Sequence, residues 1–258
     1  MAKAFITFAA ALLTCLAVMA TPAFAKIDIK VGAYHFPPFY HAKTGAGVSA
    51  DLIAFLNKAQ SDYRFTLVPT SPRRRYADMD RGRFHVMMFE MPEWGWQSHP
   101  VDTTPLLLTG GEVYVARAAA SRNQGFFDDV TKRKLIAMAG YHYGFAGFNS
   151  DAEFLRSRFD IRLTPTHEGN LISILAGRRD IAIVTKAFLR QWRRQNPDDY
   201  AKLLISEKLD QEYRLPILVG SASPLSASDL WKIVTKTENE GALRKFFTQR
   251  GLRELVAF

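Results

Sequence analysis

The residues best suited to chemistry in this sequence are aromatic rings that gather with carboxylates in short stretches. They are Tyr34, Phe36, Phe39, Phe89, Glu90, Glu93, Trp94, Trp96, Tyr141, Tyr143 and Phe145. Aromatic faces stack on planar or sugar-like molecules, and a carboxylate beside them favours a cation. Aromatic rings also fill protein cores. The pattern therefore predicts either a small-molecule site or packing between structural elements.

A run of three arginines, Arg73 to Arg75, directly follows Pro72 at the expected start of a helix. Three positive charges at the positive end of a helix dipole are unfavourable unless an anion or acidic neighbours offset them. One interpretation turns Arg75 into a ligand site, toward a carboxylate or a phosphate. The alternative is a solvated surface run.

Other catalytic and metal-binding patterns are absent from the sequence. The six histidines do not have the spacing of a metal site, although His35 and His142 occupy similar loops. There is no Gly-x-Ser-x-Gly, Walker A or dinucleotide-binding motif. We therefore expect no metal, no cofactor and no enzymatic activity.

Residues 1–25 have the features of a secretory signal. Lys3 precedes an apolar run that ends at Thr21-Pro22, and Ala23-Phe24-Ala25 matches a cleavage site. Cleavage would remove Cys15, the only cysteine, so the mature chain would carry no thiol. No later segment is apolar enough for a membrane span. We expect a soluble protein in the periplasm.

The positive charge does not by itself indicate a partner. The chain has 34 lysines and arginines against 25 acidic residues, a net charge of +9. Without Lys3 the net charge is +8, spread over short arginine clusters. This distribution does not favour nucleic acid.

Two halves of the chain repeat one plan of strands and helices. In the first, strands over 27–31, 64–68 and 84–89 alternate with helices over 49–60, capped by Ser49, and from Pro72 to Gly82. In the second, strands over 134–138, 161–163 and 180–184 alternate with helices over 150–158 and 170–176. Each half is a βαβαβ unit with parallel strands.

The repeated plan predicts two lobes of an α/β fold that face each other. Ligands of open α/β sheets bind beyond the carboxyl ends of the strands, where both aromatic loops lie. Further strands over 112–117 and 214–220 would cross between the lobes and serve as a hinge. We expect residues 26–112 and 216–258 in one lobe and 113–215 in the other.

Three motifs in order resemble the periplasmic solute-binding proteins of family 3, the amino-acid-type components of ABC importers. They are Pro37-Pro38-Phe39, Gly47 to Leu52, and the Gly-Arg-x-Asp step at Gly177 to Asp180. The resemblance implies the type II bilobal fold, with two crossover strands and C-terminal helices that return to the first lobe. Here that return is Pro216 to Phe258, with a helix that starts at Ser226 to Asp229.

The chain departs from the family where amino acids are anchored. The family's Thr-x-x-Arg element after the third strand is replaced by Met91 to Gln97, without arginine. The family's aspartate for the α-ammonium group corresponds to Thr185. A standard free amino acid is therefore not the expected ligand.

Binding of a small organic solute by hinge closure is the leading hypothesis, in a monomer that serves an ABC permease or a sensor and binds no nucleic acid. The predicted ligand-binding residues are Tyr34, Phe39, Arg75, Glu90, Trp94, Trp96, Tyr141, Tyr143 and Thr185. Some relatives of the family are dehydratases, for which Glu90, Glu93, His35 and His142 would be acid–base candidates. A periplasmic partner protein without a ligand is the third alternative.

Overall fold

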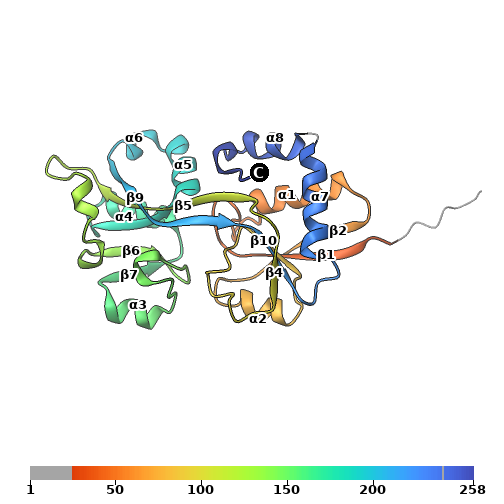
Figure 1. Cartoon of the computed structure of the whole chain (residues 1–258). Helices are drawn as coiled ribbons and strands as arrows, with labels where there is room; N and C mark the ends of the chain where they lie inside the picture. Colours follow the sequence, from red (N-terminus) through yellow and green to blue (C-terminus); the bar gives the residue numbers. More distant parts are fainter. Residues whose placement is uncertain (1–24, 240) are drawn as a thin grey trace, which may run out of the picture.

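The computed structural model describes residues 25–239 and 241–258 and contains two five-stranded sheets with helices around them (Figure 1). The predicted signal, apart from Ala25, lies outside the described residues. Within the described part of the chain, no helix is both long and apolar enough to cross a membrane. The α/β bilobal fold expected from the sequence is confirmed.

The first sheet forms lobe 1. Its strands, in spatial order, are β2 (Tyr63–Pro69), β1 (Ile27–Ala33), β3 (Val86–Met88), β10 (Ile217–Gly220) and β4 (Val101–Thr103). β1 runs parallel to both β2 and β3, as the βαβαβ pattern predicts. β10 is antiparallel to β3 and to β4.

The second sheet forms lobe 2. Its strands, in spatial order, are β7 (Ile161–Thr164), β6 (Leu135–Met138), β8 (Ile181–Thr185), β5 (Leu108–Arg117) and β9 (Leu203–Leu215). β6 is parallel to β7 and β8, so the second βαβαβ unit repeats the first. The central strands β6 and β8 are buried along their whole length because helices cover them.

Helices pack on both sheets. They are α1 (Val48–Ala59), α2 (Arg75–Asp80), α3 (Ala152–Arg158), α4 (His167–Leu175), α5 (Lys186–Gln195), α6 (Pro197–Tyr200), α7 (Ala227–Asn239) and α8 (Ala242–Gln249). Short 3₁₀ turns are η1 (Gln124–Phe127), η2 (Val130–Lys132), η3 (Gly144–Ala146) and η4 (Arg253–Leu255). Helix α1 follows from its apolar positions Leu52, Ile53 and Leu56, which are all buried.

The two lobes are linked by the long antiparallel strands β5 and β9, which run side by side between them (Figure 1). Their pairing extends from Leu108 opposite Leu215 to Arg117 opposite Leu203, with irregular register beside Glu112. With β10 the chain is back in lobe 1, where the ring of Phe246 in α8 lies 5.2 Å from that of Phe55 in α1. Ser226 caps the start of α7 as predicted, because its Oγ accepts from the amide of Asp229 at 3.1 Å.

Two local expectations are wrong. The single strand expected over 214–220 is divided at Pro216 into β9 and β10, because proline has no amide to donate to a ladder. Helix α1 is not capped by Ser49 but begins after Gly47, whose φ is 137°. A Cβ at Gly47 would lie 2.5 Å from the carbonyl oxygen of Phe39, so only glycine fits this approach.

Candidate functional site

The aromatic stretches singled out in the sequence converge between the lobes. They enclose a small cavity of about 10 Å³, close to the minimum space for one water. Its lining residues come from both lobes: Tyr34, Phe36, Arg75, Trp94, Gly140, Tyr141, His142 and Tyr213. The side chains of the two lobes therefore fill most of the space between them.

Phe36 stands at the centre of this aromatic cluster. Its ring centroid lies 5.9 Å from that of Trp94, 5.7 Å from Tyr141 and 6.1 Å from Tyr213, each nearly edge-on. Tyr141 also approaches Tyr34 edge-on at 6.3 Å. Such edge-to-face contacts are favourable and join rings from lobe 1, lobe 2 and β9 in one apolar wall.

Arg75 and Glu90 form a buried ion pair beside the cavity. The Nε of Arg75 donates to Oε1 of Glu90 at 2.9 Å, and the two side chains are 1% and 0% exposed. Further guanidinium donors bond to the backbone oxygens of Pro72 and Trp94. The guanidinium also lies 4.9 Å from the Tyr34 ring and so makes a cation–π contact.

Glu90 is placed by an unusual backbone conformation. Phe89, the residue after β3, has a φ of 59°, in the left-handed region that non-glycine residues rarely adopt. The turn carries Glu90 away from the strand, where Oε1 accepts from the Trp96 indole at 3.0 Å as well as from Arg75. Oε2 of Glu90 has no hydrogen-bond partner among the described residues.

A second buried carboxylate belongs to Glu112 on β5, which is 0% exposed. Its Oε2 accepts from Nε2 of Gln211 at 2.8 Å, and Oε1 of Gln211 accepts from the Trp94 indole at 2.9 Å. Gln211 also donates to the backbone oxygen of His142. This chain of bonds links lobe 1, the crossover strands and lobe 2.

Other contacts bridge the lobes directly. The Tyr141 hydroxyl donates to the backbone oxygen of His35 at 2.8 Å. Gly140, with φ 79°, lies so close to lobe 1 that a Cβ on it would stand 2.9 Å from Cβ of Pro72. The structure is therefore a closed arrangement in which the two lobes touch around the cavity.

The loop that presents Tyr141 is held by Asp210 of β9. The Asp210 carboxylate accepts from the amides of Gly144 and Phe145 at 2.7 and 2.9 Å. It also accepts from the Tyr114 hydroxyl at 2.6 Å. Bonds from donors to an ionised acceptor are the strong ones, so Asp210 fixes the loop's conformation.

Burial sets the protonation states of the site. It lowers the pKa of His142 to about 3, with a further contribution from Arg75, so this histidine is neutral. Burial raises the pKa of Glu112 well above its ordinary value, and the charge of Asp210 adds to the effect. Burial also raises the pKa of Glu90, while the Arg75 guanidinium acts in the opposite direction.

The predicted site residues divide into three groups. Tyr34, Arg75, Trp94 and Tyr141 line the cavity. Glu90 and Trp96 lie directly behind them, joined to each other and to Arg75. Phe39, Tyr143 and Thr185 lie outside the lining.

These last three residues have structural contacts. Phe39 stacks on Phe89 at 4.5 Å. Tyr143 is fully buried and donates to the Met138 carbonyl at 2.9 Å. Thr185 accepts from the amide of Phe188 at 3.3 Å and caps α5.

Sequence reasoning missed the contribution of the crossover strands, namely Glu112, Gln211 and Tyr213. A signal for Glu112 was present, because a single carboxylate stands in the otherwise uncharged run before Arg117. Gln211 and Tyr213 are two residues apart and share the buried face of β9. Their proximity to Trp94 follows only from the pairing of β5 with β9 across the lobes.

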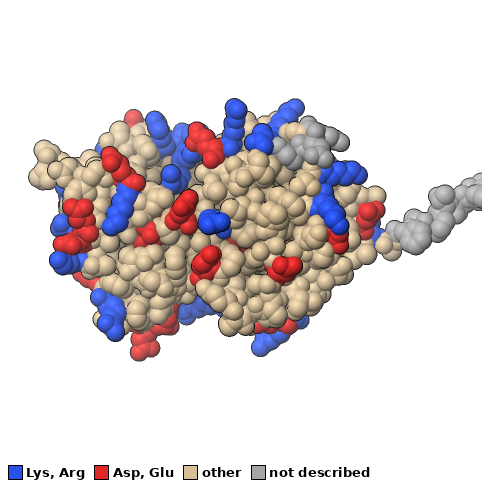
Figure 2. Space-filling view, viewed as in Figure 1, with Lys and Arg blue, Asp and Glu red and all other residues tan. Residues whose placement is uncertain are grey.

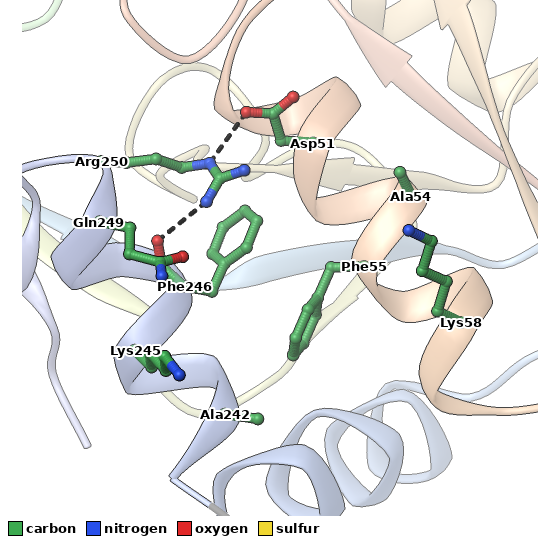
Figure 3. Close-up of a pocket in the computed structure, with 9 residues that line it drawn as sticks. All are labelled: Asp51, Ala54, Phe55, Lys58, Ala242, Lys245, Phe246, Gln249 and Arg250. Carbon is green, nitrogen blue, oxygen red and sulfur yellow. Dashed lines mark hydrogen bonds and ion pairs between the residues drawn. The ribbon is translucent and has the colours of Figure 1, made fainter.

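The surface has larger hollows away from the lobe interface. A groove of about 380 Å³ lies between α1 and α8, where Arg250 pairs with Asp51 at 2.9 Å beside the ring of Phe246 (Figure 3). Lysines and arginines are interspersed with acidic side chains over the face shown in Figure 2. This mixed pattern agrees with the dispersed positive charge expected from the sequence.

No family model matches the sequence, and no curated protein matches it. Solved structures match its fold. The GluR0 ligand-binding core from Nostoc punctiforme, in complex with L-glutamate, is 14% identical with a TM-score of 0.64, over 86% of this chain and 98% of that chain. A putative binding component of an ABC transporter from Wolinella succinogenes, complexed with lysine, is 17% identical with a TM-score of 0.66, over 86% and 94%.

This chain has the type II fold of periplasmic binding proteins. A third match is an ancestral amino-acid-binding protein described as a precursor of cyclohexadienyl dehydratase, 18% identical with a TM-score of 0.65, over 86% of this chain and 94% of that chain. The resemblance noted in the sequence is thus confirmed for the fold. The bilobal binding fold places the aromatic cavity between its two lobes.

Gly140→Ala is expected to push the two lobes apart, because the new Cβ would stand 2.9 Å from Cβ of Pro72. Gly147→Ala is the matched control: its φ of 61° is similarly left-handed, but nothing lies within 4 Å. Small-angle X-ray scattering should show a larger radius of gyration for Gly140→Ala than for the control. Equal radii would mean that this contact does not limit closure.

Proposed function

We propose that this protein binds a small organic solute between its two lobes and closes on it by a hinge motion about β5 and β9. The observation that carries the proposal is the set of buried polar groups at the lobe interface, Arg75, Glu90 and Glu112, beside rings from both lobes. Burying such groups costs free energy unless they are paired. One oxygen of each carboxylate lacks a partner among the described residues, which is a typical property of a binding site.

The solved structures of similar fold support binding of an amino-acid-like solute. Their descriptions name L-glutamate and lysine as bound molecules. In this chain the charged groups at the lobe interface stand on other elements than the arginine and aspartate of the family named above. Arg75 belongs to α2 and Glu112 to β5. We therefore expect a solute whose charged groups are arranged differently from those of a standard amino acid.

The biological setting is part of the same proposal. Residues 1–25 would direct the protein to the periplasm, where it would act as a monomer with an ABC permease or a sensor. The lobes would comprise residues 26–112 with 216–258, and residues 113–215. These divisions fall within β5 and just after β9, at positions suited to a hinge.

Retention of a ligand tests the proposal. The protein, purified from its own periplasm under native conditions, is expected to carry a small molecule that mass spectrometry detects and that dialysis against mild denaturant removes. Returning that molecule should raise the melting temperature by mass action. Absence of any retained molecule, together with no thermal shift over a broad metabolite panel, would contradict solute binding.

A dehydratase of cyclic acids is a second candidate, favoured by the match to a dehydratase precursor. Its acid–base candidates are Glu90, Glu93, His35 and His142. Glu93 is exposed and His142 is neutral, whereas Glu90 is tied to Arg75. Conversion of cyclic hydroxy acids, followed by chromatography, would favour the enzyme over the binding protein.

A further inference from the structure

The lobe interface holds one buried carboxyl group that has no cationic partner among the described residues. The guanidinium of Arg75 is matched by Glu90 at 2.9 Å, so this pair is close to neutral. Glu112 has no such partner: Gln211 is its hydrogen-bond donor, and no cation contributes to the pKa of Glu112. Among the described residues, no lysine, arginine or histidine pairs with Glu112.

Among the residues that line the cavity or are joined to the lining by hydrogen bonds, the unpartnered polar atoms belong to the two acids. Oε2 of Glu90 and Oε1 of Glu112 are buried without a hydrogen bond in the described structure. The Tyr34 hydroxyl lowers the pKa of Glu90, and the Tyr213 hydroxyl that of Glu112, as nearby hydrogen-bond donors. Neither hydroxyl stands in hydrogen-bond geometry to the two unpartnered oxygens. A ligand that matches these atoms must donate hydrogen bonds.

The surroundings of the carboxylates suit a cation as well. Burial and the charges of Glu112 and Glu90 raise the pKa of the Tyr141 phenol, and the Arg75 guanidinium, which also lines the cavity, lowers it. Tyr34, Phe36, Trp94 and Tyr213 complete an aromatic wall around the same space. Rings with negative faces and carboxylates together stabilise a positively charged amine.

We propose that the ligand of this cleft is a small organic amine with a net positive charge, whose ammonium group donates to the free oxygens of Glu90 and Glu112. This inference rests on the proposed binding function. Opening of the lobes would admit the amine, and its charge would balance Glu112 when they close.

Four molecules of similar length differ in their ammonium and carboxylate groups and so test which charge the cleft prefers: putrescine, ornithine, glutamine and glutamate. Isothermal titration of the full mature chain, stripped of bound molecules, is expected to give the tightest binding for putrescine or ornithine, at least tenfold tighter than for glutamine. Ornithine above putrescine would mean that a carboxylate is also recognised. Tighter binding of glutamine or glutamate would overturn the proposal, while absence of all binding would count against solute binding itself.

Glu112→Gln tests the role of the charge in the same titration. The variant keeps an acceptor for Gln211 but cannot ionise, so its affinity for the cation is expected to fall at least tenfold. Glu212→Gln is the matched control, because this neighbouring glutamate on β9 is exposed. Unchanged affinity of Glu112→Gln for the cation would contradict the proposal.

The pH dependence is a second readout. Burial raises the pKa of Glu112 well above its ordinary value, and Glu112 must lose a proton to pair with the amine. The affinity of the wild-type protein is therefore expected to rise with pH above the ordinary range of a glutamate, whereas that of Glu112→Gln stays flat. The other titratable groups that face Glu112 are present in both proteins: Asp210, Tyr213, Tyr141, Tyr143 and Tyr114.

Stability in the absence of ligand tests whether Glu112→Gln still folds. The pKa of Glu112 is higher in the folded protein than in the unfolded chain, so its contribution to stability is present at low pH and is lost as the pH rises. The melting temperature of Glu112→Gln should therefore exceed that of wild type at pH 8 and equal it near pH 4. A variant that is both more stable and weaker in binding cannot owe its lost affinity to unfolding.

Discussion

Replacement of Arg75 by methionine is expected to lower the free energy of unfolding by about 3–5 kcal/mol. The guanidinium is 1% exposed and is the only cation paired with Glu90 in the described structure. Its removal leaves a buried carboxylate with the Trp96 indole as its remaining hydrogen-bond donor. Urea denaturation at neutral pH measures the loss.

Two further variants separate the ion pair from simple packing. Arg75→Met combined with Glu90→Gln removes both charges, so it should recover most of the lost stability. Arg74→Met is the matched control, because Arg74 is exposed and its contact with Asp78 at 3.6 Å is expected to contribute less than about 1 kcal/mol. Equal losses for the single and double variants would show that packing of the Arg75 side chain, not charge, dominates.

Asp210→Ala is expected to reduce stability by about 3 kcal/mol or more, because it leaves three donors without their acceptor. These donors are the amides of Gly144 and Phe145 and the Tyr114 hydroxyl. Since the two amides belong to the loop that carries Tyr141, the variant should also disorder the cavity wall. Hydrogen exchange of the Gly144 and Phe145 amides is the direct measurement.

Matched variants define the contribution of Asp210. Asp210→Asn keeps one acceptor oxygen and should lose less stability than Asp210→Ala. Asp199→Ala removes an exposed carboxylate that pairs with Lys202 and is expected to change stability by less than about 1 kcal/mol. If the Gly144 and Phe145 amides stayed protected in Asp210→Ala, the loop would be held by its other contacts instead.

The strands and helices of both lobes were largely predictable because their signals are local. Apolar spacing in α1 and the uninterrupted apolar run of β8 depend only on neighbouring residues. Parallel pairing of β1 with β2 and β3 followed from the order of strands and helices. The division at Pro216 also had a local signal, which the apolar run around it concealed.

The candidate site was predictable only in part. Tyr34, Trp94 and Tyr141 stand in loops that follow strands, so the topology alone brings them toward one interface. The pairing of Arg75 with Glu90 depends on the backbone turn at Phe89, which no residue type announces. Phe39 lies in equally aromatic sequence but stacks on Phe89 outside the cavity lining.

The sequence by itself determined the two-lobed α/β plan and the aromatic character of the interface, because periodicity and loop composition are properties of short segments. Only the tertiary structure decided which charges meet there. Glu112 and Gln211 are 99 residues apart and touch because β5 and β9 pair as crossover strands. Contacts between distant segments depend on register and lobe orientation, and these are set by the packing of the whole chain rather than by any one segment.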